Sequence, residues 1–296
     1  MKQTESGLYI PCHVQPMAPI SQSDLNRYSD HLASRGKAPA TVEKYKRDIQ
    51  QFLFFLGTRT LSASHVREWI EQRLVSRTAT TVNCAIAALN GFFSFLGRTD
   101  CLIDRLKVER SEYRETSKQM SREDFDALVA TARAEGDDLL VTLLYTFAGT
   151  GIRVSELRYF TVETVRAGLI PVRNKGKNRF VAVSREVQKI ILDYAREIDC
   201  NTGPIFTDSK GKAMTRHSIW RMFKGLAQRA GVEKSRVYPH AFRALFARIL
   251  YQITKDLNGV RKALGHRSSN TTQIYLRETI CAHQALLEQM RLITVV

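Results

Sequence analysis

Apolar residues recur at helical spacing through the first hundred residues of the chain. Residues 24–34 place Leu25, Tyr28 and Leu32 three or four positions apart, which puts their side chains on one face of a helix. Similar patterns occupy residues 39–56, 64–76 and 78–96. We therefore predict a unit of four helices spanning residues 21–106.

This unit is rich in phenylalanine, and six of its rings fall within or near the apolar stretches: Phe52, Phe54, Phe55, Phe92, Phe93 and Phe95. Aromatic rings at helical spacing bury a large apolar area when helices pack together. We interpret these rings as the hydrophobic core of the unit and not as a platform on which bases stack.

The second half of the chain mixes helical patterns with two short apolar runs of strand type, residues 169–172 and 180–183. The helical patterns cover residues 121–134, 138–148, 154–159, 185–197, 215–230, 240–253 and 255–264. The predicted fold class is therefore mainly α, with a small antiparallel β-sheet in the second domain.

Two segments lack both periodicities. Residues 1–20 contain three prolines and are expected to form an irregular arm, while residues 107–119 are charged and poor in apolar residues, as is typical of a linker. The predicted domains are then a helical domain at 21–106 and a second domain at 120–296.

Charge narrows the choice of partner. The chain has 45 Lys and Arg against 29 Asp and Glu, a net charge of +16 and an isoelectric point near 9.9. An excess of this size favours a polyanion, most simply nucleic acid.

The five cysteines show no CxxC spacing, which indicates a reducing compartment and no zinc site. We see neither a signal peptide nor an apolar stretch long enough to span a membrane, and expect a cytoplasmic protein.

Candidate chemistry is concentrated near the C-terminal end. His240 and Arg243 are three residues apart, which places them on one face of the predicted helix. His266 follows Gly265, and Tyr275 comes nine residues later. A guanidinium matches phosphate oxygens, an imidazole exchanges protons near neutral pH, and a phenol is a potential nucleophile.

Two upstream segments add cations. Arg153 follows a glycine turn, with Ser155 predicted to cap the next helix, and Lys175 and Lys177 lie in a glycine-containing turn between the two strand-like runs. With these, the chain resembles the tyrosine recombinase (phage integrase) family, whose signature is Arg, hairpin Lys, His-x-x-Arg, Gly-His and Tyr in that order. Six positions match: Arg153, Lys175, His240, Arg243, His266 and Tyr275.

The resemblance implies phosphodiester cleavage. Arg153 and Arg243 would hold the phosphate, where negative charge grows during attack. Lys175, with Lys177 as the alternative, would protonate the leaving 5′ oxygen. The family usually has a second His directly after the His-x-x-Arg box, where this chain has Ala244, so a polar neighbour is missing.

The remaining roles follow from the same resemblance. His240 would act as the base, His266 would donate a hydrogen bond to the phosphate, and Tyr275 would attack to form a 3′-phosphotyrosyl link. One ester replaces another, so we expect no cofactor and no metal. No nucleotide-binding GxxxxGK[ST] loop and no HExxH motif is present.

The expected partner is double-stranded DNA. In the helical domain, basic residues of the second helix are candidates to contact it: Lys44, Lys46 and Arg47. In the second domain the candidates are Lys177 and Arg179. The family resemblance further implies that the two domains embrace a duplex, and that the chain forms a homo-tetramer on two DNA sites and a monomer or dimer without DNA.

We therefore predict a site-specific DNA recombinase or integrase. The resemblance is compatible with chromosome dimer resolution, phage integration and the movement of a mobile genetic element. Two alternatives are a type IB topoisomerase, which shares much of this constellation, and a DNA-binding accessory protein that keeps the scaffold without cutting. The length, the compact N-terminal helical unit and the HAFR and GHR boxes favour the recombinase over the topoisomerase, and the six filled signature positions argue against a protein that no longer cuts.

Overall fold

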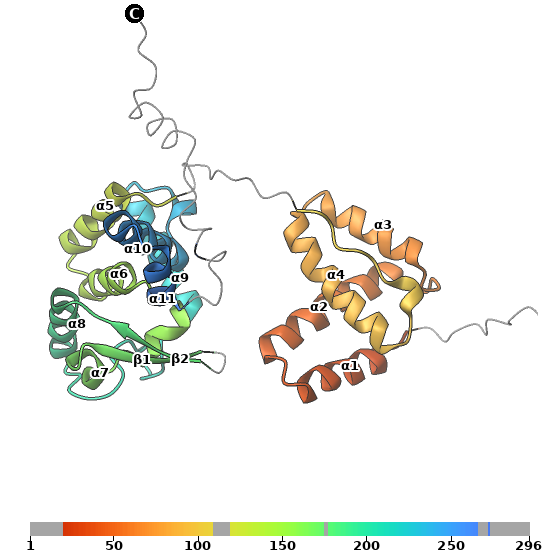
Figure 1. Cartoon of the computed structure of the whole chain (residues 1–296), viewed down its shortest axis with the longest axis horizontal. Helices are drawn as coiled ribbons and strands as arrows, with labels where there is room; N and C mark the ends of the chain where they lie inside the picture. Colours follow the sequence, from red (N-terminus) through yellow and green to blue (C-terminus); the bar gives the residue numbers. More distant parts are fainter. Residues whose placement is uncertain (1–19, 109–118, 175–176, 266–271, 273–296) are drawn as a thin grey trace, which may run out of the picture. The chain divides into compact units, whose positions relative to one another are not determined.

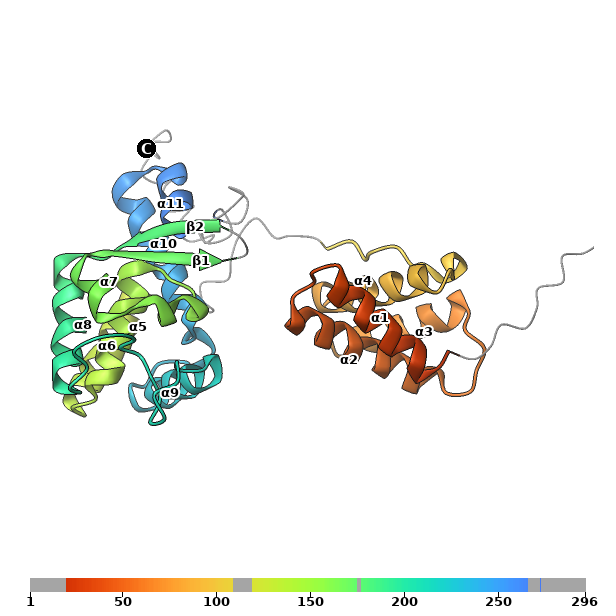
Figure 2. The ribbon, with the colours of Figure 1, turned by 90° about the horizontal axis from the view of Figure 1, so that it is seen from below.

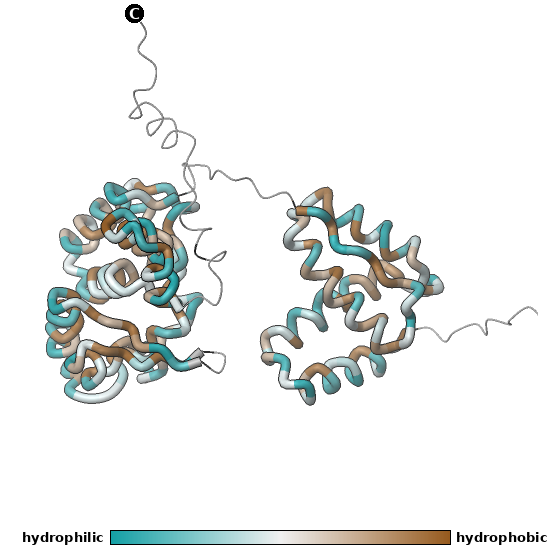
Figure 3. Tube along the Cα trace, viewed as in Figure 1, coloured by the Kyte–Doolittle hydropathy of each residue, from teal (hydrophilic) through white to brown (hydrophobic). Residues whose placement is uncertain are grey.

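The computed structural model describes residues 20–108, 119–174, 177–265 and 272. Their contacts divide the chain into two compact units, Met1–Arg110 and Ser111–Val296. The described part is mainly α-helical with one small antiparallel sheet, as predicted. Figures 1 and 2 show the two units from two directions, and Figure 3 shows apolar and polar segments alternating along the helices of both.

The first unit is a bundle of helices. These are α1 (Gln22–Ser34), α2 (Pro39–Leu56), α3 (Ala63–Leu74) and α4 (Ala79–Phe95). Local signals fix their ends: Ser21, Ser62 and Thr78 cap α1, α3 and α4 through their side chains, while α2 begins at a proline. A short 3₁₀ turn, Thr99–Cys101, follows α4.

Aromatic side chains fill the core of this unit. Phe52 of α2 meets Trp69 of α3 and Phe93 of α4 edge to face, with ring centroids 5.6 and 5.8 Å apart. Phe92 is also fully buried, so the expectation of a phenylalanine core is confirmed for these rings. It is wrong for Phe54, which is 92% exposed and does not join the core.

The second unit is built around an apolar helix, α6 (Asp138–Thr150), which packs against α5, α8 and α10. Its other helices are α5 (Arg122–Ala134), α7 (Val162–Arg166), α8 (Arg185–Glu197), α9 (Arg216–Arg229), α10 (Pro239–Thr254) and α11 (Leu257–Leu264). Short 3₁₀ segments are η3 (Val154–Tyr159) and η4 (Lys234–Arg236). Figure 1 shows the sheet beside α7 and α8 at one edge of this unit.

The sheet is a single hairpin of β1 (Leu169–Asn174) and β2 (Lys177–Ala182). Leu169 pairs with Ala182 and Asn174 with Lys177, so the hairpin extends several residues beyond the apolar runs of the sequence.

Candidate active site

The turn after α6 positions Arg153. Gly151 ends the helix with φ of 60°, and a Cβ placed on it would lie 2.5 Å from the ring of Phe246, so the turn requires glycine. Arg153 then caps η3, and its backbone N–H donates to Oε2 of Glu156 over 2.9 Å. The expectation that Ser155 caps this segment is wrong, because the Glu156 carboxylate performs that function.

Glu156 holds two arginines. Its side chain is 1% exposed, Oε1 accepts a hydrogen bond from Nη1 of Arg153 (2.8 Å), and Oε2 accepts one from Nη2 of Arg179 (2.7 Å). Burial raises the pKa of Glu156, but the backbone hydrogen bond from Arg153 and the charges of Arg179 and Arg153 outweigh it, and the pKa lies below its ordinary value. The ion pair therefore holds the guanidinium of Arg153 in place while 28% of its side chain stays exposed.

Arg243 lies inside the unit, on α10, and is 1% exposed. Its Nη2 donates to the carbonyl oxygen of Leu264 over 2.6 Å, and its Nη1 donates to that of Gly151. These contacts connect the first turns of α10 with the ends of α6 and α11. The second predicted phosphate ligand therefore sits directly beside the turn that carries Arg153.

His240 is the second residue of α10, one turn before Arg243. The residue is exposed, yet enough protein surrounds its ring for desolvation to lower the pKa of His240, and the charges of Arg243, Arg216 and Arg153 lower it further. The imidazole is therefore neutral near pH 7, as a base must be. Arg216, which begins α9, was not among the predicted residues, because only the fold brings it near His240.

Three of the six signature residues, Lys175, His266 and Tyr275, lie outside the described residues. The structure does describe the elements that precede two of them. β1 ends at Asn174, directly before Lys175, and α11 ends one residue before Gly265, which precedes His266. Lys177 lies within β2, and its side chain also falls outside the described part.

Arg179 occupies a different environment from the one predicted. Its side chain is 16% exposed, and besides the bond to Glu156 its Nη1 donates to the carbonyl oxygen of Ala263 over 3.0 Å. The guanidinium is directed into the protein, toward the end of α11. A solvent-facing contact to DNA, the expectation from the sequence, does not match this placement.

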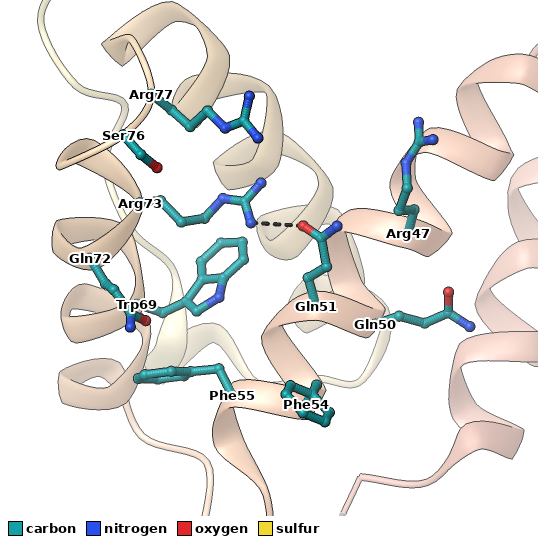
Figure 4. Close-up of a pocket in the computed structure, with 10 residues that line it drawn as sticks. All are labelled: Arg47, Gln50, Gln51, Phe54, Phe55, Trp69, Gln72, Arg73, Ser76 and Arg77. Atoms are coloured by element: carbon teal, nitrogen blue, oxygen red, sulfur yellow. Dashed lines mark hydrogen bonds between the residues drawn. The ribbon is translucent and has the colours of Figure 1, made fainter.

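In the first unit, α2 and α3 border a groove of about 770 Å³ (Figure 4). Its lining combines three arginines, three glutamines, a serine and three aromatic rings, with no carboxylate: Arg47, Gln50, Gln51, Phe54, Phe55, Trp69, Gln72, Arg73, Ser76 and Arg77. Arg73 donates to Oε1 of Gln51 over 2.7 Å and lies over the ring of Trp69, 4.6 Å from its centroid. The lining offers guanidinium and amide donors together.

The basic residues predicted on α2 differ in their surroundings. Arg47 is exposed and lines the groove. Lys44 donates to the buried carboxylate of Asp48 over 2.6 Å, and Lys46 is half-buried. Arg47 is therefore the member of this group with its charge most open to a partner.

Among the described residues, no group of three or more His, Cys, Asp or Glu side chains could hold a metal ion. None of the described helices combines the length and the apolar character needed to cross a membrane.

Residues 113–280 match the phage integrase family, and residues 25–100 match the N-terminal SAM-like domain of phage integrases. Related proteins of similar length are tyrosine recombinases. XerD of Pseudomonas aeruginosa is 30% identical over 285 residues, covering 88% of this chain and 94% of that protein. XerA of Thermococcus kodakarensis is 30% identical over 279 residues, covering 91% and 95%.

Solved structures share the fold at lower identity. A crystal structure of a XerA recombinase has a TM-score of 0.53 and 23% identity, over 92% of this chain and 99% of that one. A lambda integrase tetramer bound to a Holliday junction has a TM-score of 0.69 and 18% identity, over 86% and 76%. The matched sequence, the shared fold and the cluster of Arg153, His240 and Arg243 lead to one conclusion: the chain belongs to the phage integrase family of tyrosine recombinases.

Proposed function

We propose that this site-specific DNA recombinase cleaves and rejoins duplex DNA through Tyr275, with Arg153, Arg243, His240, His266 and Lys175 completing the site. One observation carries the proposal. Arg153 and Arg243, from segments 90 residues apart, meet at the Gly151 turn, and both lower the pKa of His240. Two cations and a neutral imidazole at one place suit a phosphodiester undergoing attack.

The chemistry balances without a cofactor. The phenol oxygen of Tyr275 attacks phosphorus as His240 takes its proton, a new O–P bond forms, and the bond from phosphorus to the 5′ oxygen breaks. Lys175, in the hairpin turn, gives a proton to that oxygen. The products are a 3′-phosphotyrosyl link and a free 5′ hydroxyl, and attack by a 5′ hydroxyl of another strand reverses the step and reseals DNA. The buried Arg243 and the partly exposed Arg153 stabilise the charge that develops on the nonbridging oxygens.

Trapping of the intermediate tests this assignment. The full-length protein is incubated with duplexes from its own genomic neighbourhood, each nicked near a candidate crossover point, and the products are separated on a denaturing gel. We expect a protein–DNA adduct at the 3′ end that Tyr275→Phe does not form, with DNA affinity nearly unchanged because only one hydroxyl is removed. An adduct that persists in Tyr275→Phe would place the nucleophile elsewhere.

We propose the helical unit, residues 21–106, as a DNA-binding domain and residues 120–296 as the catalytic domain. The α2–α3 groove supports a DNA-contacting role, because its arginines can neutralise phosphates and its glutamines can pair with base edges. Arg47 and Arg77 are both exposed there. This surface extends the predicted set, which contained Arg47 alone of the groove residues.

A homo-tetramer on two DNA sites is the assembly that we propose for strand exchange. A structural neighbour in which a lambda integrase tetramer is bound to a Holliday junction supports it. Mass photometry with and without a DNA site tests it: a tetramer formed only with DNA is expected. We also propose a cytoplasmic location, supported by the cysteine usage.

A further inference from the structure

Arg179 connects three segments of the catalytic unit that are far apart in the sequence. It lies on β2, opposite Val172 of β1. Its Nη2 reaches Glu156 in η3, 23 residues away, and its Nη1 reaches the carbonyl oxygen of Ala263 in α11, 84 residues away. Figure 2 shows β2 and α11 as neighbours in this unit.

Gly265 independently marks the same contact. It ends α11 with φ of 64°, and a Cβ built on it would lie 2.4 Å from Cδ and 2.7 Å from Nε of Arg179. A side chain at this position is thus excluded twice, by backbone conformation and by the arginine that passes beside it. The absence of a side chain at Gly265 therefore leaves the space that the Arg179 side chain occupies.

The last carbonyls of a helix have no partner within it, and cations near them are stabilising. In α11, Arg179 binds the carbonyl of Ala263 and Arg243 binds that of Leu264. The two guanidiniums come from β2 and α10. Together they fix the point at which the chain leaves α11 toward His266.

Arg179 also acts on the other side of the site. Its partner Glu156 is the carboxylate that holds Arg153, and the two guanidiniums bind different oxygens of it: Oε2 accepts from Arg179 and Oε1 from Arg153. A shift of Arg179 would leave a buried charge on Glu156 with one partner fewer, which is strongly unfavourable. Arg179 therefore influences the orientation of Arg153 through the carboxylate that the two arginines share.

We infer that Arg179 is a positioning residue for DNA cleavage, which ties the hairpin and the exit of α11 to the Arg153–Glu156 pair, and that it is not a ligand of DNA phosphate. The inference rests on the proposed function. It assigns a task to the hairpin beyond carrying Lys175: the strand that follows the turn locks the segment leading to His266.

The test separates positioning from DNA binding. In full-length protein, Arg179→Met and Arg179→Lys are compared with wild type for the rate of adduct formation at saturating nicked DNA, and for DNA affinity across a salt series. Misplacement of catalytic groups by about 1 Å can cost roughly 10²-fold in rate, so we expect a loss of that order for Arg179→Met, with a smaller loss for Arg179→Lys. The dissociation constant should stay within about twofold and the salt slope unchanged, since each phosphate contact contributes about 0.9 to that slope.

Arg196→Met is the matched control. Arg196 lies on α8 and also pairs with a carboxylate, Asp193, but it is 73% exposed. It should leave both rate and affinity unchanged. If the salt slope of Arg179→Met falls by about one unit, Arg179 contacts a DNA phosphate, and the inference is overturned. An unchanged adduct rate would overturn it as well.

A measurement without DNA distinguishes this inference from the proposed function. Hydrogen–deuterium exchange of the peptide covering α11 should speed up in Arg179→Met and in Gly265→Ala, and not in Arg196→Met. If wild type forms no adduct, the proposed function fails while the exchange result still tests the link to α11. If Arg179→Met does not fold, Gly265→Ala displaces the arginine while keeping its charge, and it should show the same loss of rate at constant affinity.

Discussion

At the scale of single residues, the second unit keeps two titratable side chains in the protonation states that phosphodiester cleavage needs. Glu156 stays ionised although it is buried, and His240 stays neutral although it is exposed. Desolvation is the largest cause of the lowered pKa of His240, followed by the charges of Arg243, Arg216 and Arg153. The backbone hydrogen bond from Arg153, in contrast, is the largest cause that lowers the pKa of Glu156. The arginine that is expected to hold phosphate therefore also contributes to the protonation state of both neighbours.

His240 predicts a pH profile. If the neutral imidazole accepts the phenol proton, the rate of adduct formation rises with pH and levels off once His240 is deprotonated. When DNA is limiting, the pH profile reports the pKa values of the free protein. Because the pKa of His240 lies below its ordinary value of 6.5, the inflection of that profile should fall below pH 6.5. His240→Gln should remove the inflection and lower the plateau by about 10²–10⁴-fold. The same inflection in His240→Gln would assign it to another group.

Glu156 predicts how stability depends on pH. Its pKa in the folded state is lower than the ordinary value of 4.5, so the folded protein binds the proton less readily than the unfolded chain does. Its contribution is therefore full above the unfolded-state pKa and disappears as pH falls through the folded-state pKa. In urea titrations, Glu156→Gln should be less stable than wild type at pH 7, by about 3–5 kcal/mol, because both arginines lose a buried charged partner, and the difference should shrink below about pH 4.5. A difference independent of pH would exclude the carboxylate as its cause.

At the scale of elements, glycines with positive φ end several helices, and some of these positions also have no room for a side chain. The catalytic unit places Gly151 at the end of α6 and Gly136 just after α5, both with positive φ, but only Gly151 is crowded, by Phe246. Ala at positive φ costs roughly 1–2 kcal/mol, and forcing a side chain into a packed site adds about 1–3 kcal/mol. Calorimetry should therefore show Gly151→Ala to be more destabilising than Gly136→Ala, which has open space around it. Equal losses would mean that Phe246 moves aside freely.

Element boundaries were predictable where capping chemistry marks them. α8 was predicted within its observed bounds because Ser184 caps it and its apolar face is regular. α7 was missed, since five residues are too few to show a helical period. The strands were predicted too short because their tip, from Arg173 to Arg179, is polar and carries no apolar alternation.

The candidate site was predictable only as far as the signature residues reach. Arg153, His240 and Arg243 were identified from their order and spacing, and the structure brings them together. Glu156 lies only three residues from Arg153, but its second partner, Arg179, and the Arg216 that acts on His240 come from segments far away in the chain. No local pattern shows that Arg179 faces inward while an arginine such as Arg47 faces solvent.

At the scale of the whole molecule, the net charge of +16 predicts DNA affinity that falls steeply with salt. A protein with 6–10 phosphate contacts loses about 10³–10⁵-fold in affinity between about 50 and 200 mM salt. Fluorescence anisotropy with a labelled duplex should give a straight line of log affinity against log salt. A shallow line would contradict phosphate neutralisation as the main source of binding.

The α2–α3 groove of the first unit should contribute to both the affinity and the sequence discrimination of DNA binding. Arg47→Ala or Arg77→Ala, in the α2–α3 groove, should each lower the slope by about one unit and weaken all duplexes alike, because a phosphate contact carries no sequence information. Gln50→Ala should keep the slope and reduce discrimination between sites, as expected for an amide that pairs with a base edge. Arg67→Ala is the control, since Arg67 is exposed on α3 but does not line the groove. At saturating DNA, all four variants should form the adduct at the wild-type rate, because the groove lies in the unit that holds none of the proposed catalytic residues. A slower rate would mean that the groove also positions the scissile phosphate.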